Sequence, residues 1–238
     1  MNAANFRRRA QHWWRTEIRP LLILALVLCS IRSSLADWYS VPSGSMQPTI
    51  LVGDRVFVNK LAYDLKVPFT TWHLAEWGNP QPGDVVVFYS PYDGQRLVKR
   101  VIGLPGDTVE LRNERLYLNG EPVDYAPLAE TISAPLPAAE RQASLFATEK
   151  LGPHPHAVMA TPALRAPRNF GPRQVPAGSY FVMGDNRDNS FDSRFWGFVP
   201  RKQIVGRATT VVMSFNHDNH WLPRGHRFLR SLDQPAAD

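Results

Sequence analysis

The chain has 238 residues, and its 27 Lys and Arg outnumber its 21 Asp and Glu, which gives a formal net charge of +6 at pH 7. This length is enough to bury one sizeable hydrophobic core. The basic excess is mainly arginine, without a zinc-finger spacing or a basic region followed by heptads, so we do not expect nucleic acid as a partner. The single cysteine, Cys29, excludes an internal disulfide and any CxxC metal or redox site.

The first distinctive segment is the apolar run PLLILALVLCSI, from Pro20 to Ile31, which follows an arginine-rich stretch. A cleaved signal peptide would have an apolar core of this length and small residues before the cut, and SLA precedes Asp37. A retained transmembrane helix needs roughly 20 residues. Both interpretations predict that the rest of the chain is exported.

Tryptophans on either side of the run favour the transmembrane helix. Trp13 and Trp38 are separated by about 38 Å of helix, close to the distance between the two membrane interfaces, where tryptophan collects. Positive charge holds a flanking segment in the cytoplasm. We therefore expect a cytoplasmic basic N-terminus at 1–19, a transmembrane helix at 20–36 and an exported β-rich domain at 37–238. The chain would cross the membrane once.

From residue 50 onwards the pattern is typical of short β-strands, rich in β-branched and aromatic residues. Seven such runs cover 54–58, 84–89, 97–104, 108–111, 115–123, 179–184 and 204–215. Asn119-Gly120 interrupts the fifth run and is a strong hairpin signal. Gly-Asp pairs precede three other runs, as turns would. We expect a mainly β fold built on an antiparallel sheet, with the N-terminal transmembrane helix as its long helix.

Residues 125–176 differ from the rest of the exported part, with nine prolines, many alanines and little periodicity. We interpret them as an insertion that forms a loop, a loose hairpin or a small cap. His154 and His156 lie here without cysteine or carboxylate neighbours in the sequence, so we expect solvated loop histidines rather than a metal site. We assign no chemistry to this insertion.

Two serines one residue apart, Ser43 and Ser45, lie in VPSGSMQPTI at 41–50, with no histidine close to them in the sequence. The GxSxG elbow of α/β-hydrolases and the HExxH motif of zinc proteases do not occur. A serine hydroxyl is a weak nucleophile until a base takes its proton. A lysine can be that base only if burial keeps it neutral near pH 7.

Lys99, in RLVKRVIGL, has more apolar neighbours in the sequence than the other lysines. In a strand, alternation places Leu97, Lys99 and Val101 on one face and Arg100 on the opposite face. Burial of that first face would favour the uncharged amine. A lysine in a strand is more often an edge or snorkelling residue, so the pattern alone leaves both interpretations open.

With Ser45, Lys99 and the loop at 184 in this order, the sequence resembles the bacterial type I signal peptidases, which are membrane-bound Ser/Lys serine proteases. Ordered blocks carry the resemblance: PSGSMQPTI (42–50), GDRVFVNKLAY (53–63), GDVVVF (83–88) with LVKRVIGLPGDTV (97–109), and GDNRDNSFDSRFWGFVP (184–200). Together they cover under half of the exported part, but they are long and nearly free of gaps.

The resemblance implies a role for each matching residue. Ser45 would be the nucleophile and Lys99 its general base. Ser43 would contribute its hydroxyl to the oxyanion hole together with the Ser45 backbone N–H. Ser190 would hydrogen-bond the Lys99 amine and orient it.

Further residues would support the loop and the substrate. Asp192 and Arg194 would form a charge pair that supports the loop. Apolar pockets for small substrate side chains would be lined by Val41, Pro42, Met46, Ile50 and Val98.

The activity implied is the removal of signal peptides from exported preproteins after small residues, in an Ala-X-Ala pattern. The resemblance also implies that 37–238 is the catalytic domain and that it lies on the periplasmic side of the inner (plasma) membrane, which the chain crosses once. The partners would be the preprotein and membrane lipid, the protein would be a monomer, and the chemistry would need no metal or cofactor. Two alternatives remain open: a self-cleaving protease of the SOS-repressor type, and a non-enzymatic membrane-anchored β-domain that binds exported chains. Trp221, in NHWLPRG, is either an exposed aromatic that contacts the membrane or a core tryptophan.

Overall fold

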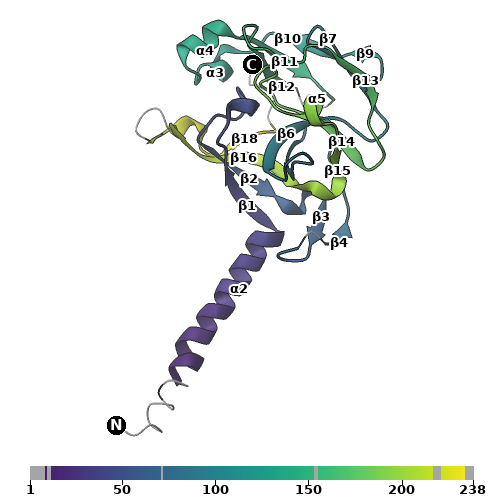
Figure 1. Cartoon of the computed structure of the whole chain (residues 1–238). Helices are drawn as coiled ribbons and strands as arrows, with labels where there is room; N and C mark the ends of the chain where they lie inside the picture. Colours follow the sequence, from purple (N-terminus) through teal and green to yellow (C-terminus); the bar gives the residue numbers. More distant parts are fainter. Residues whose placement is uncertain (1–8, 10–11, 71, 153–154, 217–220, 234–238) are drawn as a thin grey trace.

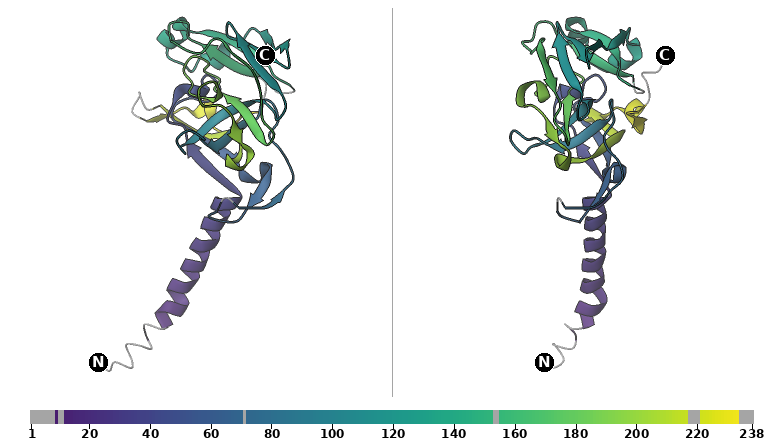
Figure 2. Two further views of the ribbon diagram at one scale, coloured as in Figure 1. Left: turned by 45° about the vertical axis from the view of Figure 1, so that its right-hand side comes forward. Right: turned by 90° about the vertical axis from the view of Figure 1, so that its right-hand side faces the viewer.

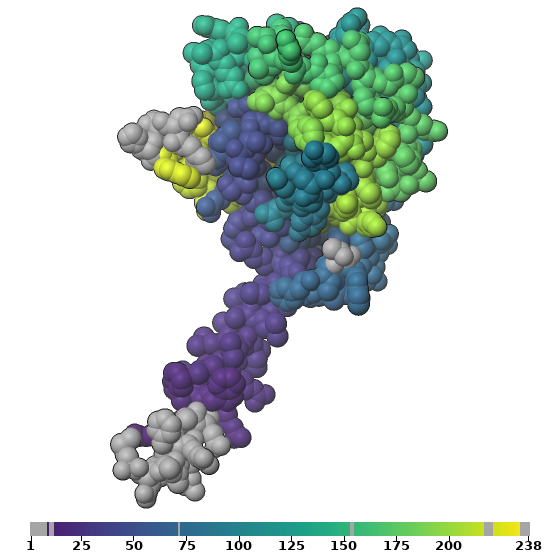
Figure 3. Space-filling view, viewed as in Figure 1, coloured from purple at the N-terminus to yellow at the C-terminus, as the bar shows by residue number. Residues whose placement is uncertain are grey.

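The computed structural model describes residues 9, 12–70, 72–152, 155–216 and 221–233. A β-rich domain follows helix α2 (Arg19–Ser34), which extends away from this domain in every view (Figures 1 and 2). In the space-filling view α2 forms a stalk below the domain (Figure 3). The prediction of a mainly β fold is confirmed.

The main sheet has nine antiparallel strands in the order β1-β2-β16-β5-β6-β14-β15, with β17 and β18 also paired to β16. Its strands are β1 (Ala36–Ser40), β2 (Asp54–Asn59), β5 (Val85–Tyr89), β6 (Arg96–Gly103), β14 (Ser179–Met183), β15 (Val199–Pro200), β16 (Ile204–Asn216), β17 (Leu222–Pro223) and β18 (Arg230–Ser231).

Strand β5 shows how this sheet comes to bury a lysine. Val85 and Val87 pack into one hydrophobic core, whereas the alternate residues Val86 and Phe88 pack into a second core on the other face. The register pairs Val86 with Lys99 of the neighbouring strand β6. Because apolar side chains cover both faces here, a lysine in the middle of β6 is removed from water.

Two smaller sheets flank the main one. A four-stranded sheet has the order β13-β7-β8-β9, and β3 pairs with β4. Their bounds are β3 (Asp64–Lys66), β4 (His73–Glu76), β7 (Thr108–Arg112), β8 (Arg115–Leu118), β9 (Glu121–Pro122) and β13 (Phe170–Gln174). The predicted hairpin joins β8 to β9, where Asn119 and Gly120 have φ values of 55° and 88°. A type I′ turn requires this left-handed backbone at both positions.

Residues 124–160, which we call the cap, are more regular than their composition indicates. They form a three-stranded antiparallel sheet in the order β10-β11-β12 and two short helices. The elements are β10 (Asp124–Ala126), α3 (Glu130–Ser133), α4 (Ala138–Ala143), β11 (Leu145–Lys150) and β12 (His156–Ala160). Of the three forms considered, the structure therefore has a small cap, at the end of the domain opposite α2 (Figures 1 and 2).

The expectation of solvated histidines in this insertion is wrong for His156. It lies on β12 and is 5% exposed, and its Nε2 is 3.2 Å from Glu149 Oε1. The register of β11 with β12 pairs these two residues, which the sequence separates by a proline-rich turn. His154 lies outside the described residues, and within the described part of the chain no group of three His, Cys, Asp or Glu residues could hold a metal ion.

The N-terminal helix ends earlier than predicted. A π-helical turn at Trp14–Ile18 leads into α2, which ends at Ser34, and Ala36 already belongs to β1. No helix in the part of the chain that the structure describes is long and apolar enough to span a bilayer.

Near the other end of the described chain, Trp221 is 63% exposed, which excludes a core position.

Candidate active site

Ser45 and Lys99 lie far apart in the sequence and meet in the structure. Ser45 is in a short 3-10 helix, η2 (Gly44–Met46), beyond the end of β1, and Lys99 is in the middle of β6. The Lys99 Nζ donates a hydrogen bond to Ser45 Oγ at 2.6 Å. Lys99 is only 3% exposed, so its amine is shielded from water, whereas Ser45 is partly exposed.

Burial changes the acidity of the Lys99 amine. It lowers the pKa from 10.5 to about 8, against the raising effect of the nearby carboxylates of Asp192 and Asp185. About half of the amine is therefore neutral near pH 8. A neutral amine 2.6 Å from a hydroxyl can accept its proton, so this pair can generate a serine nucleophile.

Residues 184–194, which we call the catalytic loop, lie beside this pair. Asp192 accepts hydrogen bonds from the Gly184 N–H at 3.0 Å and the Ser190 hydroxyl at 2.7 Å, and it pairs with Arg194 at 2.9 Å. Burial by itself raises the pKa of Asp192, but Arg194 and these hydrogen bonds outweigh it and lower the pKa. Asp192 thus stays ionised, and the structure contains the expected charge pair.

Ser190 is placed differently from the expectation. Its hydroxyl donates a hydrogen bond to Asp192 rather than to Lys99, and the Lys99 amine donates its hydrogen bond to Ser45. A carboxylate two residues away is the stronger acceptor for this hydroxyl. Ser190 therefore contacts Asp192, and the negative charge of Asp192 raises the pKa of the Lys99 amine.

Arg100, next to Lys99 on β6, holds the second carboxylate of the site. Its guanidinium donates to Asp185 at 2.8 and 2.7 Å and to the Gly83 carbonyl at 2.6 Å, and both side chains of the pair are buried. Burial raises the pKa of Asp185, but Arg100 outweighs it and lowers the pKa. Each carboxylate near Lys99 thus has its own arginine.

Two residues of the catalytic loop lie against the backbone of the serine turn, and neither could be assigned a role from the sequence. The Asn186 N–H donates to the Ser45 carbonyl at 3.1 Å, and its side-chain amide donates to the Gly44 carbonyl at 3.2 Å. A Cβ added at Gly184 would collide with the Ser45 carbonyl oxygen and the Ser190 hydroxyl. Both residues lie in the GDNRDNS block, but only the folded chain shows what they contact.

Comparison with known proteins bears on this arrangement. A family model described as "Signal peptidase, peptidase S26" matches residues 14–213. The chain belongs to this signal peptidase family. The signal peptidase I of Pseudomonas fluorescens is 42% identical over 208 residues, which are 82% of this chain and 70% of that protein. The signal peptidase I of Pseudomonas aeruginosa is 42% identical over 211 residues, with the same coverage.

A crystal structure of a signal peptidase I from Enterococcus faecalis shares 36% sequence identity with the chain. The match covers 56% of this chain and 98% of the Enterococcus faecalis chain, with a TM-score of 0.36. The family assignment rests on the sequence comparisons, which confirm the prediction of a bacterial type I signal peptidase and thus of a serine endopeptidase. The non-enzymatic alternative is thereby excluded.

The other residues expected around the peptidase's serine fall into two groups. Ser43 is exposed, and its Oγ lies 3.4 Å from Ser45 Oγ. Of the five residues expected in the substrate pockets, Pro42 is exposed and Val98 is partly exposed. The other three pack into the hydrophobic core with 4% or less of their surface exposed, so they present little surface to a substrate: Val41, Met46 and Ile50.

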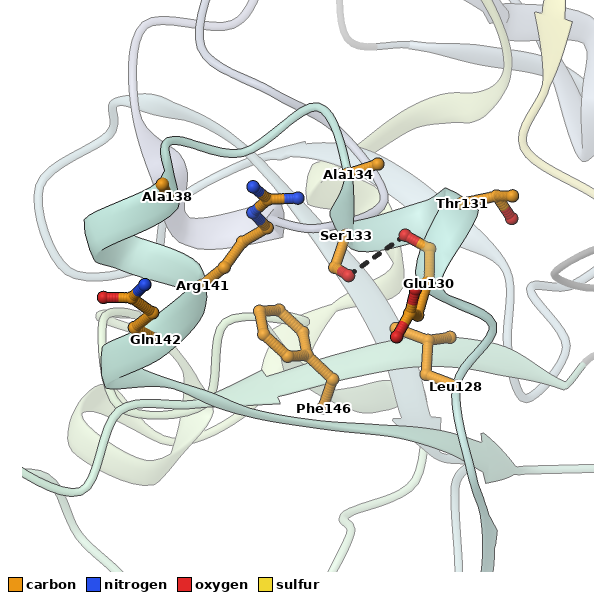
Figure 4. Close-up of a pocket in the computed structure, with 9 residues that line it drawn as sticks. All are labelled: Leu128, Glu130, Thr131, Ser133, Ala134, Ala138, Arg141, Gln142 and Phe146. Atoms are coloured by element: carbon orange, nitrogen blue, oxygen red, sulfur yellow. Dashed lines mark hydrogen bonds between the residues drawn. The ribbon is translucent and has the colours of Figure 1, made fainter.

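A separate cavity of about 620 Å³ lies in the cap of this signal peptidase, between α3, α4 and β11 (Figure 4). Figure 4 shows Arg141, Gln142 and Phe146 around it. None of the residues expected in the active site lines this cavity. It is therefore distinct from the Ser45–Lys99 pair.

Proposed function

We propose that this signal peptidase cleaves signal peptides from exported preproteins with Ser45 as the nucleophile and Lys99 as the general base. The observation that carries the proposal is the 2.6 Å contact between Lys99 Nζ and Ser45 Oγ, because Lys99 is almost fully buried. The relatives named signal peptidase I support the substrate class.

In the first half of the reaction, the neutral Lys99 amine takes the proton of Ser45 as Oγ attacks the carbonyl carbon of the scissile bond. Negative charge develops on the carbonyl oxygen. The Ser43 hydroxyl and the Ser45 backbone N–H would stabilise that charge, and one such donor typically contributes about 10²- to 10³-fold in rate. The charged Lys99 then gives its proton to the leaving amine, and the acyl group stays on Ser45.

In the second half, water attacks the acyl carbon while Lys99 takes a proton from that water. The Ser45 oxygen leaves and recovers a proton from Lys99, which restores the starting state. Every proton in this cycle passes through the one buried amine, so the residues described are sufficient for hydrolysis.

Substrate choice after an Ala-X-Ala pattern would depend on the wall beside Ser45. Pro42 and Val98 present surface there, and the packed core behind them leaves little room for movement. A large side chain would collide with this wall, whereas alanine fits a shallow depression. Val98→Ala should therefore increase cleavage after larger residues, measured with preproteins that carry Ala, Val or Leu before the cut.

We further propose that α2, extended at its N-terminal end by the π-helical turn Trp14–Ile18, anchors the enzyme in the inner membrane, with the N-terminus in the cytoplasm and the β-rich domain on the periplasmic side. Eight apolar side chains of α2 are exposed: Leu21, Leu22, Ile23, Leu24, Leu26, Val27, Leu28 and Ile31. The domain adds exposed aromatics, Phe69 and Trp72 beside β3 and β4, and Trp221. An apolar surface of this extent favours contact with lipid. Carbonate extraction of membranes tests this: a peripheral protein would be released.

The cleavage proposal is tested with the purified full chain and a preprotein carrying an Ala-X-Ala site. We expect Ser45→Ala and Lys99→Ala to lose about 10⁴-fold or more in kcat, because the nucleophile and its base act as a unit. Lys150→Ala is the matched control, since Lys150 is an exposed lysine of the cap. Circular dichroism checks that the variants are folded.

Cleavage by folded Ser45→Ala at more than about a hundredth of the normal rate would contradict the proposal, since removal of a catalytic nucleophile leaves far less activity. Cleavage of an added preprotein, in trans, also separates this function from that of a self-cleaving protease. In the latter, the chain itself would be cut and the preprotein would remain intact.

A further inference from the structure

The cap holds the catalytic loop through a buried acid, Glu149 on β11, which has no exposed surface. Arg187 of the loop donates to both of its carboxylate oxygens, at 2.8 and 2.6 Å. The Tyr125 hydroxyl, on β10, donates to the same carboxylate at 2.6 Å, and His156 of β12 lies 3.2 Å from it. The carboxylate therefore joins all three strands of the cap sheet to one loop arginine.

The backbone around Arg187 is fixed at the same place. Its N–H donates to the Met159 carbonyl of β12 at 2.7 Å, and the Met159 N–H donates to the Asp185 carbonyl at 2.9 Å. The Arg187 carbonyl accepts a hydrogen bond from Arg194 at 2.6 Å, and Arg194 is the ion-pair partner of Asp192. The position of Arg187 thus affects both the loop backbone and the charge that acts on Lys99.

The residue before Arg187 completes the connection to the nucleophile. Asn186 binds the carbonyls of Ser45 and Gly44 through its N–H and its side-chain amide. The connection from the cap to the serine is therefore short: Glu149 holds Arg187, and the adjacent Asn186 holds the serine turn.

We propose that Glu149 is a positioning residue for catalysis, which fixes the catalytic loop through Arg187 and so keeps Ser45 within hydrogen-bond reach of Lys99. The cap then has a role in the reaction without touching the substrate. This inference rests on the proposed Ser45/Lys99 chemistry.

The kind of contact supports positioning rather than general stabilisation. A guanidinium that binds both oxygens of a carboxylate is fixed in direction as well as in distance. Replacing a buried ion pair by apolar residues of similar volume is often neutral for stability, so net stability alone does not account for this pair. A reacting atom displaced by about 1 Å can lose about 10²-fold in rate.

The test compares Glu149→Gln with Glu130→Gln in the full-length enzyme. Glu130 belongs to the same cap but is exposed, on the short helix α3. For Glu149→Gln we expect kcat to fall about 10- to 100-fold while KM changes less than about twofold, because the substrate contacts are kept and the reacting pair is misplaced. Glu130→Gln should match the unaltered enzyme. All rates are measured at a temperature where both variants are folded.

A second readout separates positioning from simple loss of stability. The groups that act on the Lys99 amine are Asp192, Asp185 and Arg194. If the loop loosens, water reaches the amine and relieves the burial that lowers its pKa, so the acid limb of the pH–rate profile moves upward by about half a pH unit or more. A variant that is only less stable would keep the limb of the unaltered enzyme.

Two milder variants provide the test if Glu149→Gln does not fold. Arg187→Lys keeps the charge but loses the paired hydrogen bonds, and Tyr125→Phe removes one hydroxyl. Both should lower kcat in the same direction by smaller factors. Normal kcat and a normal acid limb in the folded variants would overturn the inference while Ser45→Ala remained inactive. Retained activity in Ser45→Ala would instead overturn the proposed chemistry.

Discussion

Lys60 and Lys99 are both buried lysines, with 9% and 3% of their surface exposed, and burial lowers the pKa of both amines. They differ in what surrounds the amine. Lys60, at the junction of α2 with β1, donates to the carbonyls of Arg32 and Ser33 at 2.8 and 3.1 Å and lies 3.5 Å from Asp37. Lys99 donates to the hydroxyl of Ser45.

The difference lies in how the neighbouring carboxylates are used. Asp37 is shared by Lys60 and Arg32, so it stabilises the charged amine directly. Near Lys99, the carboxylates of Asp185 and Asp192 are paired with arginines of their own. The proposed base is thus the buried lysine whose neighbouring carboxylates are already paired with arginines and whose amine has a hydroxyl within reach.

Replacing each lysine by arginine should give the largest difference in kcat between the two sites. Lys99→Arg keeps a positive charge in the site but removes the base, because a guanidinium does not release its proton near neutral pH. We expect kcat to fall by about 10⁴-fold or more. Lys60→Arg should stay within about twofold of the unaltered enzyme, since only a charge is needed there. Equal losses in the two variants would mean that the two sites do not differ in function.

Ser43→Ala tests the proposed oxyanion hole, which acts on the substrate carbonyl oxygen and not on the Lys99 amine. We expect kcat to fall about 10²- to 10³-fold with little change in KM, because the hydroxyl is needed only when charge develops on the carbonyl oxygen. The acid limb of the pH–rate profile should not move. Ser43→Thr keeps the hydroxyl and should recover part of the rate. A normal rate for Ser43→Ala would exclude the Ser43 hydroxyl from the oxyanion hole.

Gly184→Ala tests how closely the catalytic loop must approach the serine turn. A methyl group there would push the loop away from the Ser45 carbonyl and the Ser190 hydroxyl. We expect kcat to fall about 10²-fold, as for a displacement of about 1 Å. Gly225→Ala is the control, because a Cβ at that position meets nothing within 4 Å. Similar rates for the two variants would show that the close approach is not needed.

Asp37→Asn should have the smallest effect and should act on stability alone. It weakens the ion pair with Lys60 but leaves the two carbonyl contacts of that amine, so we expect a loss of about 1 kcal/mol in the free energy of unfolding. The value of kcat should be unchanged. Urea denaturation measures the first quantity, and a large fall in kcat would contradict the separation of the two lysine sites.

Five strands of the main sheet could be predicted from the sequence because each has its own local signal: β2, β5, β6, β14 and β16. Strand β1 and the two-residue strands gave no such signal: β15, β17 and β18. Strand β5 is a run of three valines followed by two aromatics. In the neighbouring four-stranded sheet, Asn119-Gly120 is one of the dipeptides that a type I′ hairpin strongly favours. The cap gave no such signal, because β11 and β12 each contain a single β-branched residue and most prolines lie in the connections between the strands. The buried environment of His156 depends on Glu149, which only strand pairing brings to it.

The candidate active site, too, could be predicted from the sequence only in part. Ser45 and Lys99 could be identified from local context and from the family's motifs. The bond of Ser190 to Asp192, and the hold of Asn186 on Ser45, could not, because a hydrogen-bond partner is chosen by tertiary geometry. The role of Glu149 depends on two segments that only the folded chain brings together.

The most direct measurement is an NMR titration of the Lys99 amine in enzyme labelled at lysine, with its signal assigned by its loss in Lys99→Arg. We predict a pKa of about 8, with cleavage rising as the pH rises through this value and the amine loses its proton. A pKa at or above the ordinary 10.5 would show a charged amine throughout the working range of the enzyme and would contradict the account.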